Sequence, residues 1–166
     1  MKSKIYITGA AGFIGFHAAK KFLDKGIKVH GFDSINNYYD VNLKRSRLKI
    51  LKKYKNFSFT KGLLEKQKLL DQSVYKFKPS IIIHLAAQAG VRYSIENPDV
   101  YLSSNILGTF NVLNISNRIG LKHLIIGSSS SVYGANRKIP FQEIDKTDHQ
   151  VSFYAATKKC NELIAD

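Results

Sequence analysis

A tyrosine and a lysine stand four residues apart near the end of the chain, in the run Tyr154-Ala155-Ala156-Thr157-Lys158. On a helix this spacing places both side chains on one face. A phenol has an ordinary pKa of about 10, so it is a useful base near neutral pH only when its neighbours favour the phenolate. A cation one turn away is such a neighbour. The pair is common on helix surfaces, and it predicts proton transfer only where other elements bring a substrate to it.

Hydroxyl groups are concentrated in the run Gly127-Ser128-Ser129-Ser130-Ser131-Val132-Tyr133-Gly134. This run follows an apolar stretch, 122–127, that is typical of a buried strand. Ligands of doubly wound sheets bind at the carboxyl ends of the strands, so we expect these hydroxyls to face a ligand. A serine-rich turn that satisfies its own backbone is the plainer alternative.

Three glycines join a strand-like run to a helix-like run in the segment Thr8-Gly9-Ala10-Ala11-Gly12-Phe13-Ile14-Gly15. Glycines let the backbone approach a pyrophosphate closely, and a helix N-terminus offers it free N–H groups. Asp33 stands 18 residues after Gly15, where its carboxylate can bind ribose hydroxyls and repel a 2′-phosphate. The pattern predicts a dinucleotide site that favours NAD over NADP. A glycine turn with a capping aspartate is the alternative.

Short apolar runs alternate with amphipathic runs along the whole chain. The runs over 4–8, 28–32, 57–60, 80–85 and 122–127 are typical of strands. The runs over 13–25, 41–54, about 65–77, 98–118 and from about 153 onward are typical of helices. Strands separated by helices imply right-handed crossovers in a parallel sheet. We predict an α/β fold with a doubly wound parallel sheet (Rossmann), forming one NAD-binding domain over 1–166.

The chain is strongly basic, with 26 lysines and arginines against 12 acidic residues and a net charge of +14. Many of the cations fall in the segment 41–54, whose apolar residues form one broad side of a helix. We interpret the lysines as the solvated face of that helix, which could also attract a phosphorylated substrate. No nucleic-acid motif accompanies them, so we expect no nucleic-acid partner.

The remaining composition points to a reducing, aqueous compartment. Cys160 is the single cysteine, so it has no internal disulfide partner, and no Cys/His cluster suggests a metal. No stretch approaches the ~20 apolar residues needed to cross a bilayer. The amino terminus, Met1-Lys2-Ser3-Lys4, lacks the apolar region of a signal peptide. We expect a cytoplasmic protein with no membrane partner.

Longer segments accompany the Gly-x-x-Gly-x-x-Gly and Tyr-x-x-x-Lys patterns. They are Asn36–Lys44, His84–Pro98, Ser128–Ala135 and Tyr154–Leu163. Together these segments resemble the extended short-chain dehydrogenase/reductases of the NAD-dependent epimerase/dehydratase family, and they look most like UDP-glucuronate 4-epimerases. The resemblance covers essentially all of the 166 residues.

The resemblance implies an NAD-dependent nucleotide-sugar 4-epimerase (an isomerase of polysaccharide biosynthesis). It would interconvert UDP-glucuronate and UDP-galacturonate through a 4-keto intermediate. Tyr154 would take the proton of the 4-hydroxyl, Ser129 would share a hydrogen bond with that hydroxyl, and Lys158 would also bind the nicotinamide ribose. NAD would accept hydride from C4 and return it to the other face of the sugar.

The resemblance also assigns residues to each part of the site. The catalytic residues would be Ser129, Tyr154 and Lys158. The cofactor-binding residues would be Gly9, Gly12, Phe13, Ile14, Gly15, Asp33, Asn37, Leu85, Ala86, Ala87, Asn105, Tyr154 and Lys158. The substrate-binding residues would be Gln88, Arg92, Ser129, Ser130 and Ser131, with no metal ligand.

Family members run to about twice this length. We therefore expect the chain to be the N-terminal part of a longer enzyme whose C-terminal substrate domain is absent, and to be inactive alone. The resemblance also implies a homodimer of the full-length protein, formed by the helix near 98–119 and the tyrosine-bearing helix.

One departure from the family pattern is Gly62-Leu63, where the family usually carries Gly-Asp beside the adenine. This change is expected to weaken cofactor affinity or adenine selectivity.

Two alternatives stay open. A nucleotide-sugar dehydratase, decarboxylase or other reductase shares the fold, although dehydratases usually place Asp-Glu where this chain has Ser130 and Ser131. The other alternative is a non-catalytic module that binds NAD or nucleic acid, or an inactive fragment.

Overall fold

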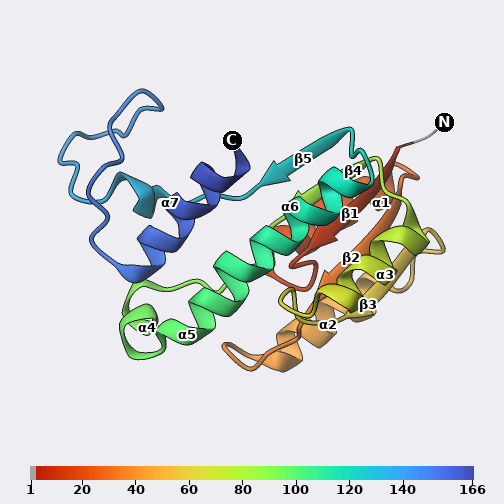
Figure 1. Ribbon diagram of the computed structural model, residues 1–166. Coiled ribbons are helices and arrows are strands. Elements are labelled where there is room, and N and C mark those ends of the chain that lie inside the picture. Colours follow the sequence, from red (N-terminus) through yellow and green to blue (C-terminus); the bar gives the residue numbers. More distant parts are fainter. Residues whose placement is uncertain (1–2) are drawn as a thin grey trace. The chain divides into compact units, whose positions relative to one another are not determined.

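The computed structural model contains one parallel sheet with helices on both faces. It describes residues 3–166, so Met1 and Lys2, part of the amino terminus expected to carry no signal, lie outside the described residues. The five strands are ordered β3-β2-β1-β4-β5 and every neighbouring pair is parallel. They are β1 (Lys4–Thr8), β2 (Lys28–Asp33), β3 (Phe57–Lys61), β4 (Ile81–His84) and β5 (His123–Ile126) (Figure 1).

Helices follow each of the first four strands, as right-handed crossovers require. The helices are α1 (Phe13–Asp24), α2 (Val41–Leu51), α3 (Gln67–Phe77), α4 (Val91–Glu96), α5 (Pro98–Tyr101), α6 (Gly108–Arg118) and α7 (Phe153–Ala165). A π-helical segment, η1 (Leu102–Leu107), and a 3₁₀ turn, η2 (Ser130–Tyr133), complete the set. The predicted doubly wound α/β fold is confirmed. Among the described residues, no helix is both long and apolar enough to cross a membrane.

The chain forms two compact units. The first unit comprises Met1–Ala86 and Asn111–Gly127, and the second comprises Ala87–Phe110 and Ser128–Asp166. The division falls inside α6. The first unit holds the whole sheet, and the second unit consists of helices, turns and a long loop.

Side-chain alternation along the strands gives the first unit two apolar cores. Ile5 and Ile7 point to the face covered by α1 and α2, whereas Tyr6 between them points to the face covered by α3 and α6. Alternation of this kind is the period-2 pattern of a strand buried on both faces. Ile82 and Ile83 divide between the two cores in the same way.

The structure departs from the sequence-based expectation at three places. The expectation that the lysines of 41–54 are solvated is wrong for Lys44, which is only 4% exposed. The helix expected over 98–118 is interrupted by the π-helical turn of η1, and α4 was not expected at all. The contacts made by these residues are described below.

Candidate active site

Two glycines of the loop in the first unit lie so close to neighbouring backbone that neither has room for a Cβ atom. Gly9 has φ of +73°, and its N–H donates to the carbonyl of Phe32 at 2.8 Å. A Cβ atom on Gly9 would lie 2.8 Å from the backbone nitrogen of Ala86, and one on Gly15 would lie 2.1 Å from the carbonyl oxygen of Gly9. Glycine is therefore required at both positions for α1 to begin against the end of β1.

The N-terminus of α1 is open to a ligand. Its N-cap residue, Gly12, makes no side-chain capping bond, and the first helical residues, Phe13 and Ile14, are 67% and 66% exposed. Free N–H groups and the helix dipole make such an end favourable for an anion such as a pyrophosphate. The close glycine packing and the open helix end fit the dinucleotide loop predicted from the sequence.

Asp33 anchors this loop from the end of β2. It is 8% exposed, and its Oδ2 accepts from the N–H of Ala11 at 3.0 Å while its Oδ1 accepts from the N–H of Ile35 at 2.8 Å. A carboxylate oxygen has two lone pairs, so each oxygen retains acceptor capacity for a ribose hydroxyl. Asn37 is exposed in the loop that follows.

Two cations of α2 support the same region. Lys44 Nζ donates to the carbonyl oxygen and the Oδ1 of Asn36 at 2.8 and 2.6 Å, and it lies 4.1 Å from the ring centre of Tyr39. Burial lowers the pKa of Lys44, and the nearby charge of Asp33 opposes that change. Lys44 is buried because it closes the loop after β2, a contact that helical periodicity does not predict.

Arg47 ties this loop to the glycine loop. Its guanidinium donates to the carbonyl oxygen of Ala11 at 3.3 Å and to the hydroxyl of Tyr39 at 3.2 Å. Arg47 is one of the cations of 41–54, and the helical pattern of that segment does not predict these two bonds.

The end of β4 is joined to the end of β1 by Thr8. Thr8 Oγ1 accepts from the backbone N–H groups of Leu85 and Ala86, each at 3.1 Å, and contacts His84 Nδ1 at 2.7 Å. Leu85 and Ala86, predicted to line the cofactor, thus lie beside the glycine loop. Ala87, the third predicted residue of that run, is exposed in the second unit.

The residue that replaces the family aspartate follows β3. Gly62 donates its N–H to the carbonyl of Asp33 at 3.0 Å, and Leu63 is 43% exposed. Leu63 therefore belongs to the same end of the sheet as Asp33 and offers only an apolar surface there. The expected effect of this residue on adenine binding stays a prediction.

Tyr154 and Lys158 lie one turn apart on α7 in the second unit. Tyr154 is partly exposed, whereas Lys158 is only 4% exposed. Burial lowers the pKa of the Lys158 ammonium, and the carboxylate of Glu162 acts in the opposite direction. The helix therefore places a buried ammonium one turn from a partly exposed phenol.

Ser129 precedes η2, which packs against α7. Its Oγ accepts from the N–H of Ser131 at 3.2 Å, so Ser129 caps this short turn. The preceding Ser128 donates its hydroxyl to Oε1 of Glu162 on α7 at 2.5 Å. The second unit therefore brings the serine run next to the helix of Tyr154 and Lys158, while Ser130 remains exposed.

The long loop between η2 and α7 is closed at its base. The N–H of Ala135 donates to the carbonyl of His149 at 3.0 Å, and Gln150 Nε2 donates to the carbonyl of Val132 at 3.2 Å. A Cβ on Gly134, which has φ of +54°, would lie 1.8 Å from that His149 oxygen. The base of the loop therefore sets the spacing between η2 and the start of α7.

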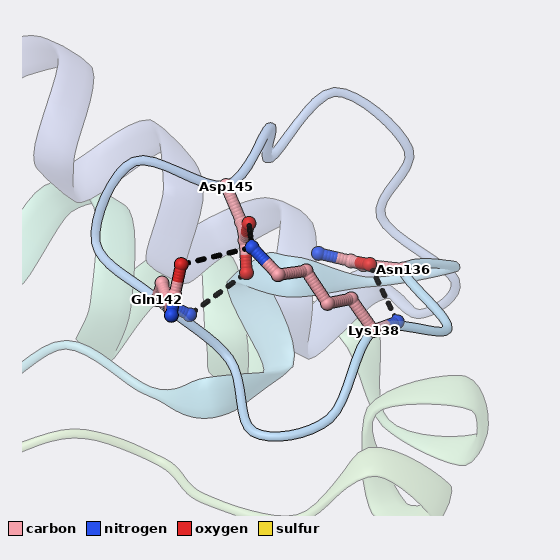
Figure 2. A network of polar contacts seen from close by, with 4 residues as sticks. All are labelled: Asn136, Lys138, Gln142 and Asp145. Atoms are coloured by element: carbon pink, nitrogen blue, oxygen red, sulfur yellow. Dashed lines mark hydrogen bonds and ion pairs between the residues drawn. The ribbon is translucent and has the colours of Figure 1, made fainter.

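A polar network stiffens the outer part of this loop (Figure 2). Lys138 Nζ donates to Oδ1 of Asp145 at 2.8 Å and to Oε1 of Gln142 at 2.9 Å, and Oδ2 of Asp145 accepts from the N–H of Gln142 at 2.8 Å. Asn136 Oδ1 accepts from the N–H of Lys138 at 2.9 Å. The Lys138 ammonium lowers the pKa of Asp145, so the ion pair between them holds to a lower pH than an isolated carboxylate would keep its charge.

Three other predicted residues lie in the second unit. Asn105 is fully buried in η1, and its amide binds the backbone of Gln88 and the hydroxyl of Thr157. Gln88 is 4% exposed, and Arg92 is exposed on α4. The contacts of Asn105 are thus with the protein itself, and the predicted cofactor and substrate roles of these three residues stay predictions. Within residues 3–166, no group of three or more His, Cys, Asp or Glu side chains is arranged to hold a metal ion.

A glycine loop after the first parallel strand, an acid after the second and a tyrosine–lysine turn on a later helix are shared by the short-chain class of dinucleotide-dependent dehydrogenases and reductases. Comparison with known proteins narrows this class. A sequence model described as GDP-mannose 4,6 dehydratase matches residues 6–166. The chain belongs to this family, the NAD-dependent epimerases and dehydratases.

Two curated relatives carry epimerase names. The chain is 51% identical over 159 residues to a probable UDP-glucuronate 4-epimerase of Rhizobium meliloti, covering 96% of this chain and 47% of the relative. It is 45% identical over 162 residues to UDP-glucuronate 4-epimerase 4 of Arabidopsis thaliana, covering 97% and 37%. The chain therefore spans about half the length, or less, of these relatives.

A solved structure has the same fold. The UDP-glucose 4-epimerase of Bifidobacterium longum, crystallised with NAD+ and UDP, superposes with a TM-score of 0.86 at 27% identity. The match covers 98% of this chain and 48% of that protein.

Proposed function

We propose that the full-length protein containing this chain is an NAD-dependent nucleotide-sugar 4-epimerase that interconverts UDP-glucuronate and UDP-galacturonate. The observation that carries the proposal is the arrangement on α7, where the buried Lys158 lies one turn from Tyr154 and η2 packs beside them. Relatives named UDP-glucuronate 4-epimerase support the choice of sugar. In this proposal the chain is the NAD-binding part and the remaining half supplies most substrate contacts.

The first unit fits NAD. Gly9 and Gly15 stand where no Cβ can be accommodated, and the N-terminus of α1 lacks a side-chain cap. Asp33 retains lone pairs for the ribose hydroxyls and carries a charge that disfavours a 2′-phosphate. When bound, NAD supplies the acceptor for hydride from C4 of the sugar and the donor that returns it. Structures of relatives solved with NAD support this assignment.

The second unit supplies the proton transfer. Tyr154 removes the proton of the 4-hydroxyl as that carbon is oxidised and gives it back when the carbonyl is reduced. Lys158 stabilises the phenolate electrostatically in a site where burial strengthens its field. Ser129 shares a hydrogen bond with the same hydroxyl. Acid–base catalysis by a positioned group of this kind contributes about 10²–10⁴-fold to a rate.

A dehydratase is the competing activity, because the matching family model carries that description. Elimination of water needs a second acid and base near the reacting carbons. The two residues after Ser129 are Ser130, which is exposed, and Ser131, whose N–H is bonded to Ser129. Neither can act as a carboxylate, so this loop favours epimerisation.

The test is proton NMR of UDP-glucuronate incubated with the full-length protein, with Tyr154→Phe as the matched variant. We expect UDP-galacturonate to accumulate toward equilibrium with the wild type, and Tyr154→Phe to retain bound NAD while turnover falls by at least about 100-fold. A 4-keto-6-deoxy product from another nucleotide sugar would assign a dehydratase instead. Unchanged UDP-glucuronate in the presence of bound NAD would exclude the proposed substrate.

A further inference from the structure

Ser94 of α4 forms a hydrogen bond with the backbone of Tyr154. Its side chain is 0% exposed, and its Oγ accepts from the N–H of Tyr154 at 3.1 Å. The same hydroxyl donates to the carbonyl oxygen of Val91 at 2.6 Å. A serine hydroxyl has a single proton, so the bond to Val91 leaves its lone pairs for Tyr154. The Val91 carbonyl thus orients Ser94 as an acceptor.

The bond adds a second side-chain acceptor to the N-terminus of α7. The first N–H groups of a helix have no partner within the helix, and Tyr154 is the second residue of α7. The side chain of Ser152, the N-cap, accepts from the N–H of Ala155 at 3.1 Å. Ser94 accepts one of the first-turn N–H groups that this cap leaves open, that of Tyr154. A residue about 60 positions earlier in the chain therefore fixes the backbone from which the phenol projects.

Tyr101 holds the ring of Tyr154 from the same segment. The two rings meet edge to face with centroids 6.0 Å apart, and Tyr101 is fully buried. The Tyr101 hydroxyl contacts the carbonyl oxygens of Ala89 and Gly90 at 2.7 and 2.6 Å, which ties it to the turn that begins α4. Tyr154 is thus held at its backbone by Ser94 and at its ring by Tyr101.

We propose that Ser94 is a positioning residue that fixes Tyr154 in its reactive orientation through the backbone of α7. The inference rests on the proposed function, in which Tyr154 transfers the proton. It gives the segment 88–101 a role that needs no contact with the substrate. Ser94 acts on the rate of the chemical step and leaves substrate binding unchanged.

The experiment compares three variants of the full-length protein: Ser94→Ala, Ser94→Cys and Ser103→Ala. Cysteine retains a weak acceptor of similar size at position 94. Ser103 is the matched control, because its hydroxyl also bonds within the helix, to the carbonyl of Asp99 at 2.9 Å. The measurements are kcat and KM for UDP-glucuronate, bound NAD, and the hydrogen-exchange rate of the Tyr154 amide by NMR.

We expect Ser94→Ala to lower kcat by about 10- to 100-fold, since a misplacement of ~1 Å can cost about 100-fold. KM should stay within about twofold, and exchange of the Tyr154 amide should accelerate at least about tenfold, because its acceptor is lost. Ser94→Cys should recover part of both losses, and Ser103→Ala should match the wild type. If Ser94→Ala does not fold, the same comparison is made between Ser94→Cys and Ser103→Ala.

Two results would overturn the inference. In the first, amide exchange accelerates in the Ser94 variants but their kcat stays within twofold of that of Ser103→Ala. The bond would then exist without affecting the reaction. The second is unchanged amide exchange. A wild-type protein that does not turn over UDP-glucuronate refutes the proposed substrate, and the inference is then decided by amide exchange and by whether the Tyr154 ring signals shift in Ser94→Ala.

Discussion

The side-chain amide of Asn105 forms two hydrogen bonds with the backbone of Gln88. Its Oδ1 accepts from the N–H of Gln88 at 2.7 Å, and its Nδ2 donates to the carbonyl of the same residue at 3.0 Å. The Nδ2 also donates to Oγ1 of Thr157 at 3.1 Å, and Thr157 bonds to the carbonyl of Tyr154 at 2.8 Å. One amide in η1 therefore joins the chain after β4 to the helix of the proposed catalytic tyrosine.

Asn105→Ala should lower the free energy of unfolding by about 2–4 kcal/mol, because it leaves a buried N–H and two buried acceptors without partners. The measurement is urea unfolding of the full-length protein. Asn117→Ala, at an exposed position of α6, is the matched control and should change the stability by less than about 0.5 kcal/mol. An equal effect of the two substitutions would contradict the stabilising role of the Asn105 hydrogen bonds.

A comparison of Gly9→Ala with Gly26→Ala should separate the stability cost of backbone strain from that of a steric collision. Both glycines have φ of +73°, but a Cβ on Gly26 meets nothing within 4 Å, whereas one on Gly9 would press on Ala86. We expect Gly26→Ala to cost about 1 kcal/mol of stability from the φ angle alone. Gly9→Ala should cost about 1–3 kcal/mol more and should abolish NAD binding in calorimetric titration. Retention of NAD affinity by Gly9→Ala would refute the dinucleotide loop.

Lys44→Met should destabilise the protein by about 1 kcal/mol. The substitution removes two hydrogen bonds from an ammonium to Asn36, which are each stronger than neutral bonds, but it also relieves the cost of burying the charge. Lys49→Met, on the exposed side of the same helix, is the control and should be nearly neutral. Chemical unfolding of both variants checks the prediction, and a Lys49 effect as large as that of Lys44 would contradict it.

The buried His30 should make the protein sensitive to mild acid. Burial lowers its pKa from an ordinary 6.5 to about 4, and it bonds to Ser58 and Thr60 as a neutral ring. Below pH 6.5 the ring of His30 binds a proton in the unfolded chain but not in the folded chain. The free energy of unfolding should therefore fall as the pH drops from about 6.5 to about 4, and His30 should cause no further change below that range. The loss attributable to His30 is at most about 3 kcal/mol.

Unfolding measured between pH 7 and pH 4 tests this expectation. His30→Gln removes the titrating ring, so the variant should lose less stability over this range than the wild type does. Parallel curves for the two proteins would show that the acid sensitivity comes from other groups.

The succession of the strands and longer helices along the chain could be predicted from the sequence because it depends on local pattern. The Lys4–Thr8 strand was predicted at its observed bounds, since β-branched residues alternate there and a glycine follows. The glycine loop and the Tyr154–Lys158 turn were placed correctly because each lies within one short segment.

Other features depend on contacts that the pattern of apolar and polar residues does not contain, and they could not be predicted in the same way. The burial of Lys44 depends on the loop that it closes, and the bond from Ser94 to Tyr154 spans about 60 residues. Asn105, which bonds to the backbone of Gln88, lies in the π-helical turn η1, and helical periodicity does not predict such a turn. The roles assigned to the individual site residues stay predictions until the experiments above are made.

The wide turn of η1 also bears on how this helix can change over evolutionary time. A π-helical turn holds about one residue more than an α-helical turn. Deleting a single residue between Leu102 and Leu107 would convert the wide turn into an α-helical turn, and the flanking turns would keep their faces because the wide turn already accommodates the extra residue. The residues inside the turn, Asn105 among them, would instead change the direction in which their side chains point, and the hydrogen bonds of Asn105 to Gln88 would be lost. Insertions and deletions should therefore be tolerated in the surface loop 136–148 and selected against in these six residues, although they carry no charged side chain.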